Sequence, residues 1–389
     1  MSFSFNHSSS VFITCPFKTS TLCAAEVEKL GYKVDQIKDN AITIQATLKD
    51  CIKLNMNLRT ASKVLWLLFE GKASNAEELY RLVQTYDWEL LMTVDGYFSI
   101  QSFTQNSTIN NTLFTNLKVK DAIADFFIKK YNKRPDSGPE NRGLQLYIYW
   151  IADQVRIYID TSGDTLARHG YRKIPLKAPL QENLAAAIIL ATNWDLKSPF
   201  INPMCGSGTL AIEAAMMMTN RVPGLIKKDY AFQRLKGYSD EWYRDEQIAC
   251  RMAVSHDVLS PVIASDLSAD AIRSAKINAS LAGLDTKIKF QQCPFEETMI
   301  PEEKGIIIIN PPYGERIGEE QDLKLLYKKI GDFFKTRCKG YKGYVFTGNP
   351  ELAKYIGLKP SKKIPFFNAK IECRLLAFDI YEGSKKQFT

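Results

Sequence analysis

Between residues 180 and 309, apolar helices alternate with short apolar segments, and this alternation constrains the fold more than any other feature. The short segments are continuous apolar runs, which is typical of strands that are buried on both faces. A parallel sheet covered by helices on both sides satisfies the pattern, and ligands of such sheets bind at the carboxyl ends of the strands. The expected helices are 180–192, 209–218 and 269–282, and the expected strands are 199–201, 262–264, 288–290 and 306–309.

The preceding residues show a smaller mixture of helices and strands, which indicates an α+β region. A loop rich in proline, glycine and charge, KRPDSGPENRG, interrupts this region before its last hairpin. We place the boundary between the two regions at residues 163 and 164. The expected strands of the first region are 11–14, 32–34, 41–44, 97–103 and a hairpin over 144–159, and its expected helices are 22–30, 48–68, 76–83 and 117–131.

Several classes of protein are disfavoured by the composition. The longest apolar runs, such as 64–69 and 185–192, fall short of the ~18 residues that a membrane helix needs. The amino terminus has no basic residue before Lys18 and no apolar block like that of a signal peptide. The eight cysteines form no C-x-x-C pair and the three histidines lie far apart. We therefore expect a cytoplasmic protein with no membrane partner and no metal.

The net charge of +8 is unevenly distributed. Residues 1–165 hold 18 basic and 18 acidic side chains, whereas residues 166–389 hold 33 and 25. A basic excess favours a polyanionic partner such as nucleic acid, because cations neutralise phosphates. A mildly basic enzyme with no such partner is equally consistent with the charge alone.

A glycine-containing turn follows the first strand of the alternating region. The sequence NPMCGSGTLAIEAA places Gly206 and Gly208 where a helix opens. Glycines allow the backbone to approach a ligand, and the free N–H groups of a helix start attract polar or anionic groups. The turn is neither a P-loop, because no Lys-Ser or Lys-Thr pair follows it, nor a full dinucleotide fingerprint, because Ala211 replaces the third glycine. A helix that begins at such a turn without any ligand is the alternative.

An aspartate ends the second strand, in the sequence IASDLSADAI. At the carboxyl end of a strand, the carboxylate of Asp266 can accept hydrogen bonds from both hydroxyls of a ribose. A plain helix cap is the alternative interpretation, and Ser268 or Asp270 can also cap the next helix. The segment from Gly208 to Asp266 exceeds the ~20 residues of a dinucleotide fold. We interpret residues 220–257 as an insertion.

The strand over 306–309 is followed by Asn310-Pro311-Pro312-Tyr313, which cannot continue a strand. The prolines fix the backbone, so the Asn310 side-chain oxygen and the adjacent carbonyls become rigid acceptors beside the aromatic ring of Tyr313. Two acceptors next to a ring suit the exocyclic amino group of a stacked base. A simple turn is the alternative. The glycine turn and the aspartate, in the same order at the same edge, favour the chemical interpretation.

Together these motifs resemble the class I S-adenosylmethionine-dependent methyltransferases. Four further segments, SGDTLARHGYRK, APLQENLAAAIIL, VPGLIKKDYAF and NAKIECRLLAFDIY, narrow the resemblance to THUMP-domain RNA methyltransferases. Within that family, the bacterial enzymes that methylate N2 of a guanine in large-subunit ribosomal RNA are the most similar. The resemblance implies a Rossmann-like α/β domain, with a seven-stranded mixed sheet and a terminal antiparallel hairpin, preceded by an α+β region. The implied domains are ferredoxin-like (1–50), RNA-binding THUMP (51–163) and methyltransferase (164–389).

The resemblance also implies the cofactor, S-adenosylmethionine, and the roles of matched positions. The catalytic residues are Asn310, Pro311, Pro312 and Tyr313. Asn202 stands where the family usually has an aspartate, and Cys293 or a neighbour stands where an aspartate often meets the adenine. The implied cofactor-binding residues are Leu180, Gln181, Asn202, Pro203, Cys205, Gly206, Ser207, Gly208, Asp266 and Asn310.

Candidate RNA contacts come from basic residues in both regions. The reaction that we expect is methyl transfer to the N2 atom of a guanine in RNA, with large-subunit rRNA as the substrate. A nucleic-acid adenine-N6 methyltransferase or a protein-glutamine methyltransferase would use the same acceptors, and a non-catalytic RNA-binding protein is a third possibility. The sequence does not indicate an oligomeric state. The candidate RNA contacts are Lys129, Lys130, Lys133, Arg134 and Arg316.

Overall fold

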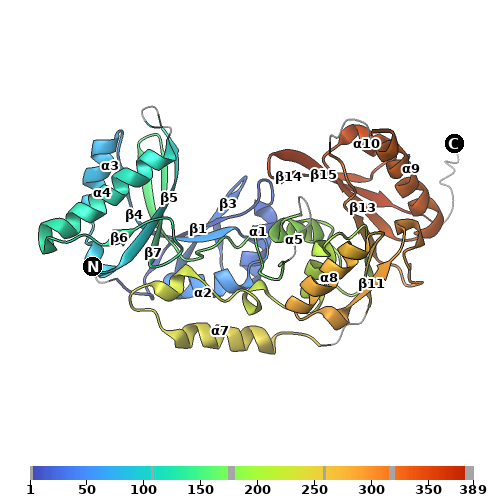
Figure 1. Ribbon diagram of the computed structural model, residues 1–389, viewed down its shortest axis with the longest axis horizontal. Coiled ribbons are helices and arrows are strands. Elements are labelled where there is room, and N and C mark those ends of the chain that lie inside the picture. The colour runs from blue at the N-terminus through green and yellow to red at the C-terminus, as the bar shows by residue number, and fades with distance from the viewer. Residues whose placement is uncertain are drawn as a thin grey trace. The chain divides into compact units, whose positions relative to one another are not determined.

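The computed structural model describes residues 3–106, 109, 111–173, 180–256, 260–314 and 320–381, and Figure 1 shows its helices and strands. The chain forms two compact units, each assembled from several segments. The first unit comprises Met1–Cys15, Cys23–Leu166 and Lys228–Ala249. The second unit comprises Pro16–Leu22, Ala167–Lys227 and Cys250–Thr389.

The second unit is built on a seven-stranded sheet with the strand order β11-β10-β9-β12-β13-β15-β14. The first five strands of this order are parallel, and β15 runs antiparallel to both β13 and β14. The expected α/β fold with a terminal antiparallel hairpin is therefore confirmed. The strands are β9 (Phe200–Pro203), β10 (Val262–Asp266), β11 (Ile288–Gln292), β12 (Ile306–Ile309), β13 (Lys342–Thr347), β14 (Lys362–Asn368) and β15 (Ile371–Asp379).

Helices cover both faces of this sheet. In β12, Ile306 and Ile308 belong to the core on one face, whereas Ile307 and Ile309 belong to the core on the other. Burial on both faces explains why this strand is a run of isoleucines and does not alternate with polar residues. The first core includes residues of α5 (Glu182–Ala191), α6 (Thr209–Met218) and α8 (Ala269–Leu281), and the second includes residues of α9 (Glu320–Arg337) and α10 (Pro350–Lys354).

The first unit is built on an eight-stranded sheet with the order β2-β3-β1-β4-β8-β7-β5-β6. Most of its neighbouring strands are antiparallel, and β5 pairs in parallel with β7 and β6. This sheet confirms the expected α+β region. Its strands are β1 (Ser8–Thr14), β2 (Val34–Lys38), β3 (Ala41–Thr47), β4 (Lys63–Lys72), β5 (Tyr97–Gln105), β6 (Asp136–Ser137), β7 (Leu144–Ile151) and β8 (Gln154–Asp160).

The prediction of one helix over 48–68 is wrong. Helix α2 (Leu48–Asn57) ends early, and β4 begins at Lys63 as a central strand between β1 and β8. Val64 and Leu65 are fully buried there. A short apolar run fits a buried strand as well as a helix, and only its pairing partners distinguish the two. The other helices of the first region are α1 (Ser20–Lys29), α3 (Ala76–Gln84) and α4 (Thr112–Tyr131).

The insertion predicted over 220–257 contributes to the first unit, because Lys228–Ala249 packs there. Helix α7 (Asp240–Met252) makes two of the contacts. The Asn57 side chain of α2 donates a hydrogen bond to Glu246 Oε1 of α7 over 2.7 Å, and the rings of Phe5 and Trp242 lie 5.0 Å apart. No helix in the part of the chain described by the structure is both long and apolar enough to cross a membrane.

Candidate active site

Three strands of the second unit end at one edge of its sheet, where the strand order reverses. There β9 lies between β10 and β12, and this is the type of position at which α/β sheets bind ligands. The pairing of β9 with β12 stops at Ile201 and Ile307. Beyond it, the Asn202 side chain donates a hydrogen bond to the Ile308 carbonyl over 2.9 Å. The amide of Asn202 therefore links two strands where their backbones no longer pair.

The glycine turn lies directly after β9. Gly208 N–H donates to the Cys205 carbonyl over 2.9 Å and closes the turn, and Gly208 precedes α6 as its cap residue. Gly208 has a φ of +82°, and a Cβ there would lie 2.9 Å from Ala275 Cβ. Only glycine fits such a position without strain. Among the described residues no side chain caps the start of α6, so its first N–H groups point toward this edge of the sheet.

Asp266 connects the end of β10 with the glycine turn. Its Oδ2 accepts a hydrogen bond from Gly206 N–H, and its Oδ1 accepts one from Ser268 N–H, both over 2.9 Å. The cap of α8 is Ser268, whose hydroxyl accepts from Ala271 N–H over 3.3 Å. Each carboxylate oxygen can accept a second hydrogen bond. The structure thus brings Asp266 and the turn together and leaves acceptor capacity at the carboxylate.

Asn202 carries a buried acceptor without a partner. The residue is 1% exposed, and no described donor reaches its Oδ1. An unpaired polar atom in such a position costs free energy unless a ligand satisfies it. Pro203 and Met204 follow, and Met204 has a φ of +55°. The oxygen of Asn202 is therefore available to a hydrogen-bond donor on a ligand at the strand end.

The sequence Asn310-Pro311-Pro312-Tyr313 directly follows β12. Asn310 Oδ1 is shielded from solvent, and it too has no donor among the described residues. Pro311 is buried and Pro312 is exposed. Because neither proline has an N–H group, the backbone at these two residues offers only carbonyl acceptors, and it is stiff. The unsatisfied oxygen therefore lies on a rigid support at the same edge as the glycine turn.

Tyr313 is anchored by the terminal hairpin. Its hydroxyl accepts a hydrogen bond from Asn368 Nδ2 of β14 over 3.0 Å, and its ring meets Phe346 edge-on with centroids 6.5 Å apart. Burial raises the pKa of Tyr313 to about 12. The phenol is therefore neutral at physiological pH, and the ring offers a neutral aromatic surface and not a base.

Leu180 and Gln181 precede α5, and an arginine that the sequence interpretation left without a role joins them to α6. Arg172 Nη2 donates to the Leu180 carbonyl over 2.5 Å and to Thr209 Oγ1 over 2.8 Å. Thr209 is the first residue after the glycine turn. Arg172 thus fixes Leu180 relative to the start of α6. It lies in the quoted segment SGDTLARHGYRK, so the sequence carried a signal for it.

Arg172→Lys is expected to weaken the binding of S-adenosylmethionine about tenfold. Nη2 donates both hydrogen bonds, and the compact ammonium of a lysine on its differently shaped stem should keep only one of them. The loss of one charge-assisted hydrogen bond is worth about 1.5 kcal/mol. Calorimetric titration measures this change. Arg273→Lys, at an exposed pair with Asp270 on α8, is the control and should leave the affinity unchanged. Equal affinity of the two variants would contradict the positioning role of Arg172.

Two further sets of residues behind the turn escaped the sequence interpretation. Asn278 of α8 donates to the Ser207 carbonyl over 3.1 Å and is fully buried. Glu213 of α6 is also fully buried, and its Oε1 lies 2.7 Å from His169 Nδ1 and 2.8 Å from the Tyr171 hydroxyl. Burial raises the pKa of Tyr171. These polar groups support the turn from inside the domain. Their contacts depend on how the helices pack, so the sequence pattern alone does not predict them.

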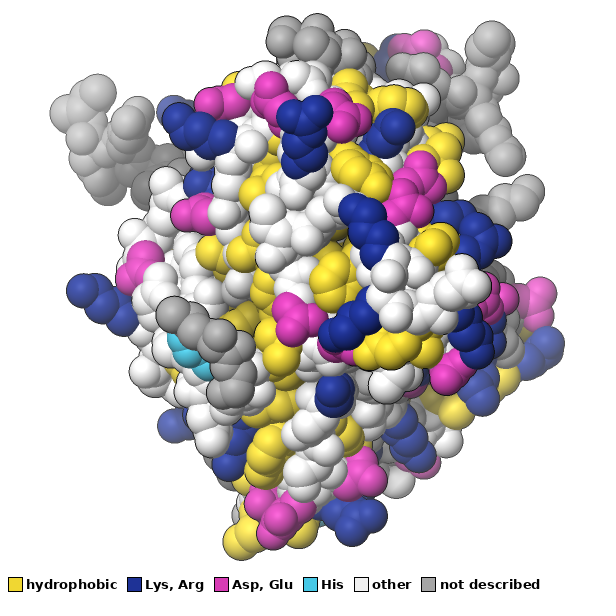
Figure 2. All heavy atoms as spheres, turned by 90° about the vertical axis from the view of Figure 1, so that its left-hand side faces the viewer, with side chains coloured by type: hydrophobic (Ala, Val, Ile, Leu, Met, Phe, Trp, Pro, Cys, Tyr) yellow, Lys and Arg dark blue, Asp and Glu magenta, His cyan; other side chains and the backbone are white. Residues whose placement is uncertain are grey.

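The predicted RNA contacts lie in the first unit, apart from Arg316, which is outside the described residues. Lys130 pairs with Glu89, Lys133 pairs with Asp95, and Lys129 donates to Gln84 Oε1. Arg134 lines a small cavity together with the acidic Glu77, Asp121 and Asp125. Figure 2 views the molecule from the side on which Figure 1 labels α3 and α4, and basic and acidic side chains are intermixed over the described part of this view. The basic run is therefore largely balanced by neighbouring acids.

No cluster of metal-binding side chains occurs among the residues that the structure describes. The edge formed by β9, β10 and β12 offers instead a glycine turn, a helix start, a carboxylate and two unpaired amide oxygens. Cys293 lies beside it, because its N–H donates to the Asp266 carbonyl over 3.1 Å. Burial raises the pKa of the Cys293 thiol, so a neutral thiol occupies this place.

Three protein-family models match the chain. Residues 10–65 match the RlmL ferredoxin-like domain, residues 73–160 match the THUMP domain, and residues 169–377 match the RMKL-like methyltransferase domain. The ribosomal RNA large subunit methyltransferase K/L of Syntrophotalea carbinolica is 38% identical over 95% of this chain. The chain spans about half of that relative, 53% of its length.

Two other proteins are similar over nearly their whole length. A Synechocystis protein provisionally named as an RNA methyltransferase is 32% identical, and the match covers 95% of this chain and 96% of that protein. A crystal structure of a provisionally assigned methyltransferase, solved with SAH bound, has a TM-score of 0.86 and 27% identity. The match covers 97% of this chain and 99% of the chain in that crystal structure.

Proposed function

The chain belongs to the RMKL-like methyltransferase family, and from this premise we propose that it transfers a methyl group from S-adenosylmethionine to the N2 atom of a guanine in RNA. We propose large-subunit ribosomal RNA as the substrate. The name of the Syntrophotalea carbinolica relative supports this choice, as does the match to a THUMP domain.

The observation that carries the proposal is the unpaired oxygen of Asn310. A solvent-shielded acceptor on a rigid backbone, next to a neutral aromatic ring, fits an amino group on a planar base. A hydroxyl or thiol has only one hydrogen to donate, so it would use one acceptor and not two. An exocyclic amine satisfies the oxygen of Asn310 and brings its nitrogen to the sheet edge at the same time.

The residues at the strand ends fit the proposed cofactor. Gly206, Ser207 and Gly208 would hold the methionine part, and the Asn202 oxygen, which lacks a donor, would accept from its ammonium group. Asp266 would accept from the ribose hydroxyls. Leu180, Gln181, Pro203, Cys205 and Asn310 complete the proposed set. Leu180 is tied to the same helix start through Arg172.

The cofactor supplies a methyl group on a positively charged sulfur. In the proposed reaction, Asn310 Oδ1 and the Pro311 carbonyl accept the two N–H groups of the guanine amine, and Tyr313 stacks on the base. These acceptors draw the nitrogen lone pair out of conjugation and aim it at the methyl carbon. As the nitrogen–carbon bond forms, the sulfur–carbon bond would break and the neutral thioether S-adenosylhomocysteine would leave. The positive charge would thereby move to the nitrogen, where both acceptors stabilise it. The extra proton then passes to water, so no general base is required.

We propose that the ferredoxin-like (1–50) and THUMP (51–163) regions bind RNA and present it to the methyltransferase region (164–389). Lys129, Lys130, Lys133, Arg134 and Arg316 remain the proposed phosphate contacts. The side chains of Lys130 and Lys133 are each more than half exposed, and ion pairs of exposed lysines exchange readily for a phosphate. With such a substrate, we propose a cytoplasmic location.

The test is to incubate the purified chain with isotope-labelled S-adenosylmethionine and unmodified ribosomal RNA, followed by mass spectrometry of the nucleosides. We expect label in N2-methylguanosine. Label in N6-methyladenosine would replace this proposal with the adenine alternative. RNA binding with no label in any nucleoside would identify a non-catalytic binding protein.

A further inference from the structure

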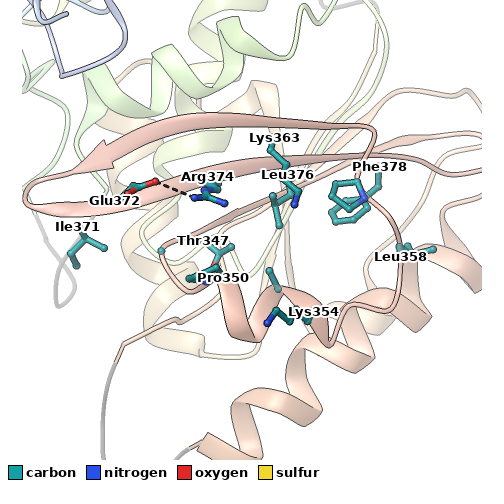
Figure 3. Close-up of a pocket in the computed structure, with 13 residues that line it drawn as sticks. Thr347, Pro350, Lys354, Leu358, Lys363, Ile371, Glu372, Arg374, Leu376 and Phe378 are labelled. Carbon is teal, nitrogen blue, oxygen red and sulfur yellow. Dashed lines mark hydrogen bonds and ion pairs between the residues drawn. The ribbon is translucent and has the colours of Figure 1, made fainter.

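A cavity of about 640 Å³ opens between the β14–β15 hairpin and α10 (Figure 3). Its size is within the range of sites that hold small ligands. Figure 3 shows Lys363 and Arg374 on the hairpin side and Lys354 on the α10 side. The accessible apolar part of its lining includes Leu358, Pro360 and Ile371, and the buried Leu376 and Phe378 lie behind them. The charged residues of the lining are the cations Lys354, Lys363 and Arg374 and the acid Glu372.

The cavity adjoins the proposed catalytic residues. Gly348, in its lining, separates Tyr313 from Ile371: a Cβ at Gly348 would lie 2.9 Å from Tyr313 Cε2 and 2.8 Å from Ile371 Cγ2. Along the sheet, β12 ends at Asn310, the glycine turn and Asp266 lie on the β9 and β10 side, and the cavity lies on the β13 and β15 side. The cavity is therefore on the opposite side of the catalytic residues from the proposed cofactor site.

Its charge favours an anionic occupant. Arg374 pairs with Glu372 over 3.3 Å, and Lys354 pairs with Glu351 over 2.6 Å, but all four side chains are about half or more exposed. Exposed pairs of this kind are weak and can be replaced by a phosphate. No ion pair to Lys363 occurs among the described residues. An apolar wall beside several cations is the combination that binds a base together with its phosphate.

We propose that this cavity holds the nucleotide next to the target guanine in the RNA strand. The inference rests on the proposed function. A base whose amino group is methylated must leave its stack, and its neighbour then loses a stacking partner. The apolar wall of the cavity replaces that contact, and Lys363 and Arg374 hold the phosphate. The cavity thus acts as a substrate subsite that selects unstacked RNA.

The first test compares Lys363→Ala with Lys362→Ala. The two lysines are adjacent in β14, and strand alternation places them on opposite faces, with only Lys363 in the cavity lining. Anisotropy of a short labelled single-stranded RNA measures binding. Lys363→Ala should weaken RNA binding about fivefold and reduce the slope of log affinity against log salt by about 0.7, as expected for one lost phosphate contact. Lys362→Ala should bind RNA as the wild type does, and both variants should bind S-adenosylmethionine with unchanged affinity.

Leu358→Trp tests the cavity itself, because a larger side chain fills the space without changing the charge. We expect a rise in the KM for RNA of at least about fivefold, with little change in kcat. Thermal melting should show that all variants are folded. If Lys363→Ala and Leu358→Trp both bind and methylate RNA as Lys362→Ala does, the subsite does not exist.

Photo-crosslinking separates this inference from the proposed function. RNA carrying 4-thiouridine beside the target guanine should crosslink to peptides within residues 347–378. Crosslinks found only elsewhere would overturn the subsite, even if methylation proceeds. If the wild-type chain methylates no RNA, the proposed function fails, and RNA binding and crosslinking still decide whether the cavity holds a nucleotide.

Discussion

Asn310→Ala is expected to lower the single-turnover rate of methyl transfer by about a hundredfold to a thousandfold. The substitution removes one of the two acceptors that orient the guanine amine, and the loss of a single well-placed polar group in an active site costs about this much. The dissociation constant of S-adenosylmethionine should change only a few-fold, because the glycine turn and Asp266 remain intact. Rapid-quench measurements with labelled cofactor, together with calorimetric titration, give both quantities.

Asn310→Asp is the matched variant for this prediction. It keeps an oxygen acceptor at the same position and should retain more activity than Asn310→Ala. Asn310 Oδ1 has no hydrogen-bond partner among the described residues, so neither substitution removes a hydrogen bond that they donate to it. Full activity of Asn310→Ala at saturating cofactor and RNA would refute the catalytic role.

Asp266→Ala is expected to weaken the binding of S-adenosylmethionine about a hundredfold. The variant loses the acceptor for the ribose hydroxyls, and it also releases the Gly206 N–H that the carboxylate holds over 2.9 Å. One or two charge-assisted hydrogen bonds, at about 1.5–3 kcal/mol each, correspond to this change in affinity. Calorimetric titration measures it directly, and the methylation rate should recover at high cofactor concentration.

Asp270→Ala provides the control for this second prediction. Asp270 lies only four positions further, in the first turn of α8, but its side chain is 78% exposed and pairs with Arg273. Its loss should leave cofactor affinity within about twofold of the wild type, since exposed ion pairs contribute little. If both aspartate variants bind the cofactor equally well, Asp266 has only a structural role.

The architecture of the second unit follows from local patterns, and its polar contacts do not. The run over 306–309 and the helix over 209–218 carry enough apolar residues to be recognised without neighbours, and both are found as predicted. The hydrogen bond from Asn202 to Ile308 depends on how two distant strands align. Arg172 likewise meets Leu180 and Thr209 only because α5 and α6 pack together. Local sequence patterns do not predict contacts between segments that lie far apart in the chain.

The first unit shows the same limit more strongly. The apolar residues 64–69 continue a helical pattern, and only pairing with β1 and β8 makes them a strand. The basic run near residue 130 suggests an open cationic surface, but the acids that pair with Lys130 and Lys133 come from positions 41 and 38 residues earlier in the chain. The free energy of these arrangements comes from tertiary contacts, which local propensity does not encode.

The segmented composition of the first unit has a consequence for its synthesis on the ribosome. Its last piece, Lys228–Ala249, is translated only after the stretch Ala167–Lys227 of the second unit has been made. Domains usually fold in order as the nascent chain emerges. Here the strands of the amino-terminal sheet are made before α7, so Phe5 lacks its contact with Trp242 until that helix has been translated. Chaperones are expected to engage the nascent chain during that interval.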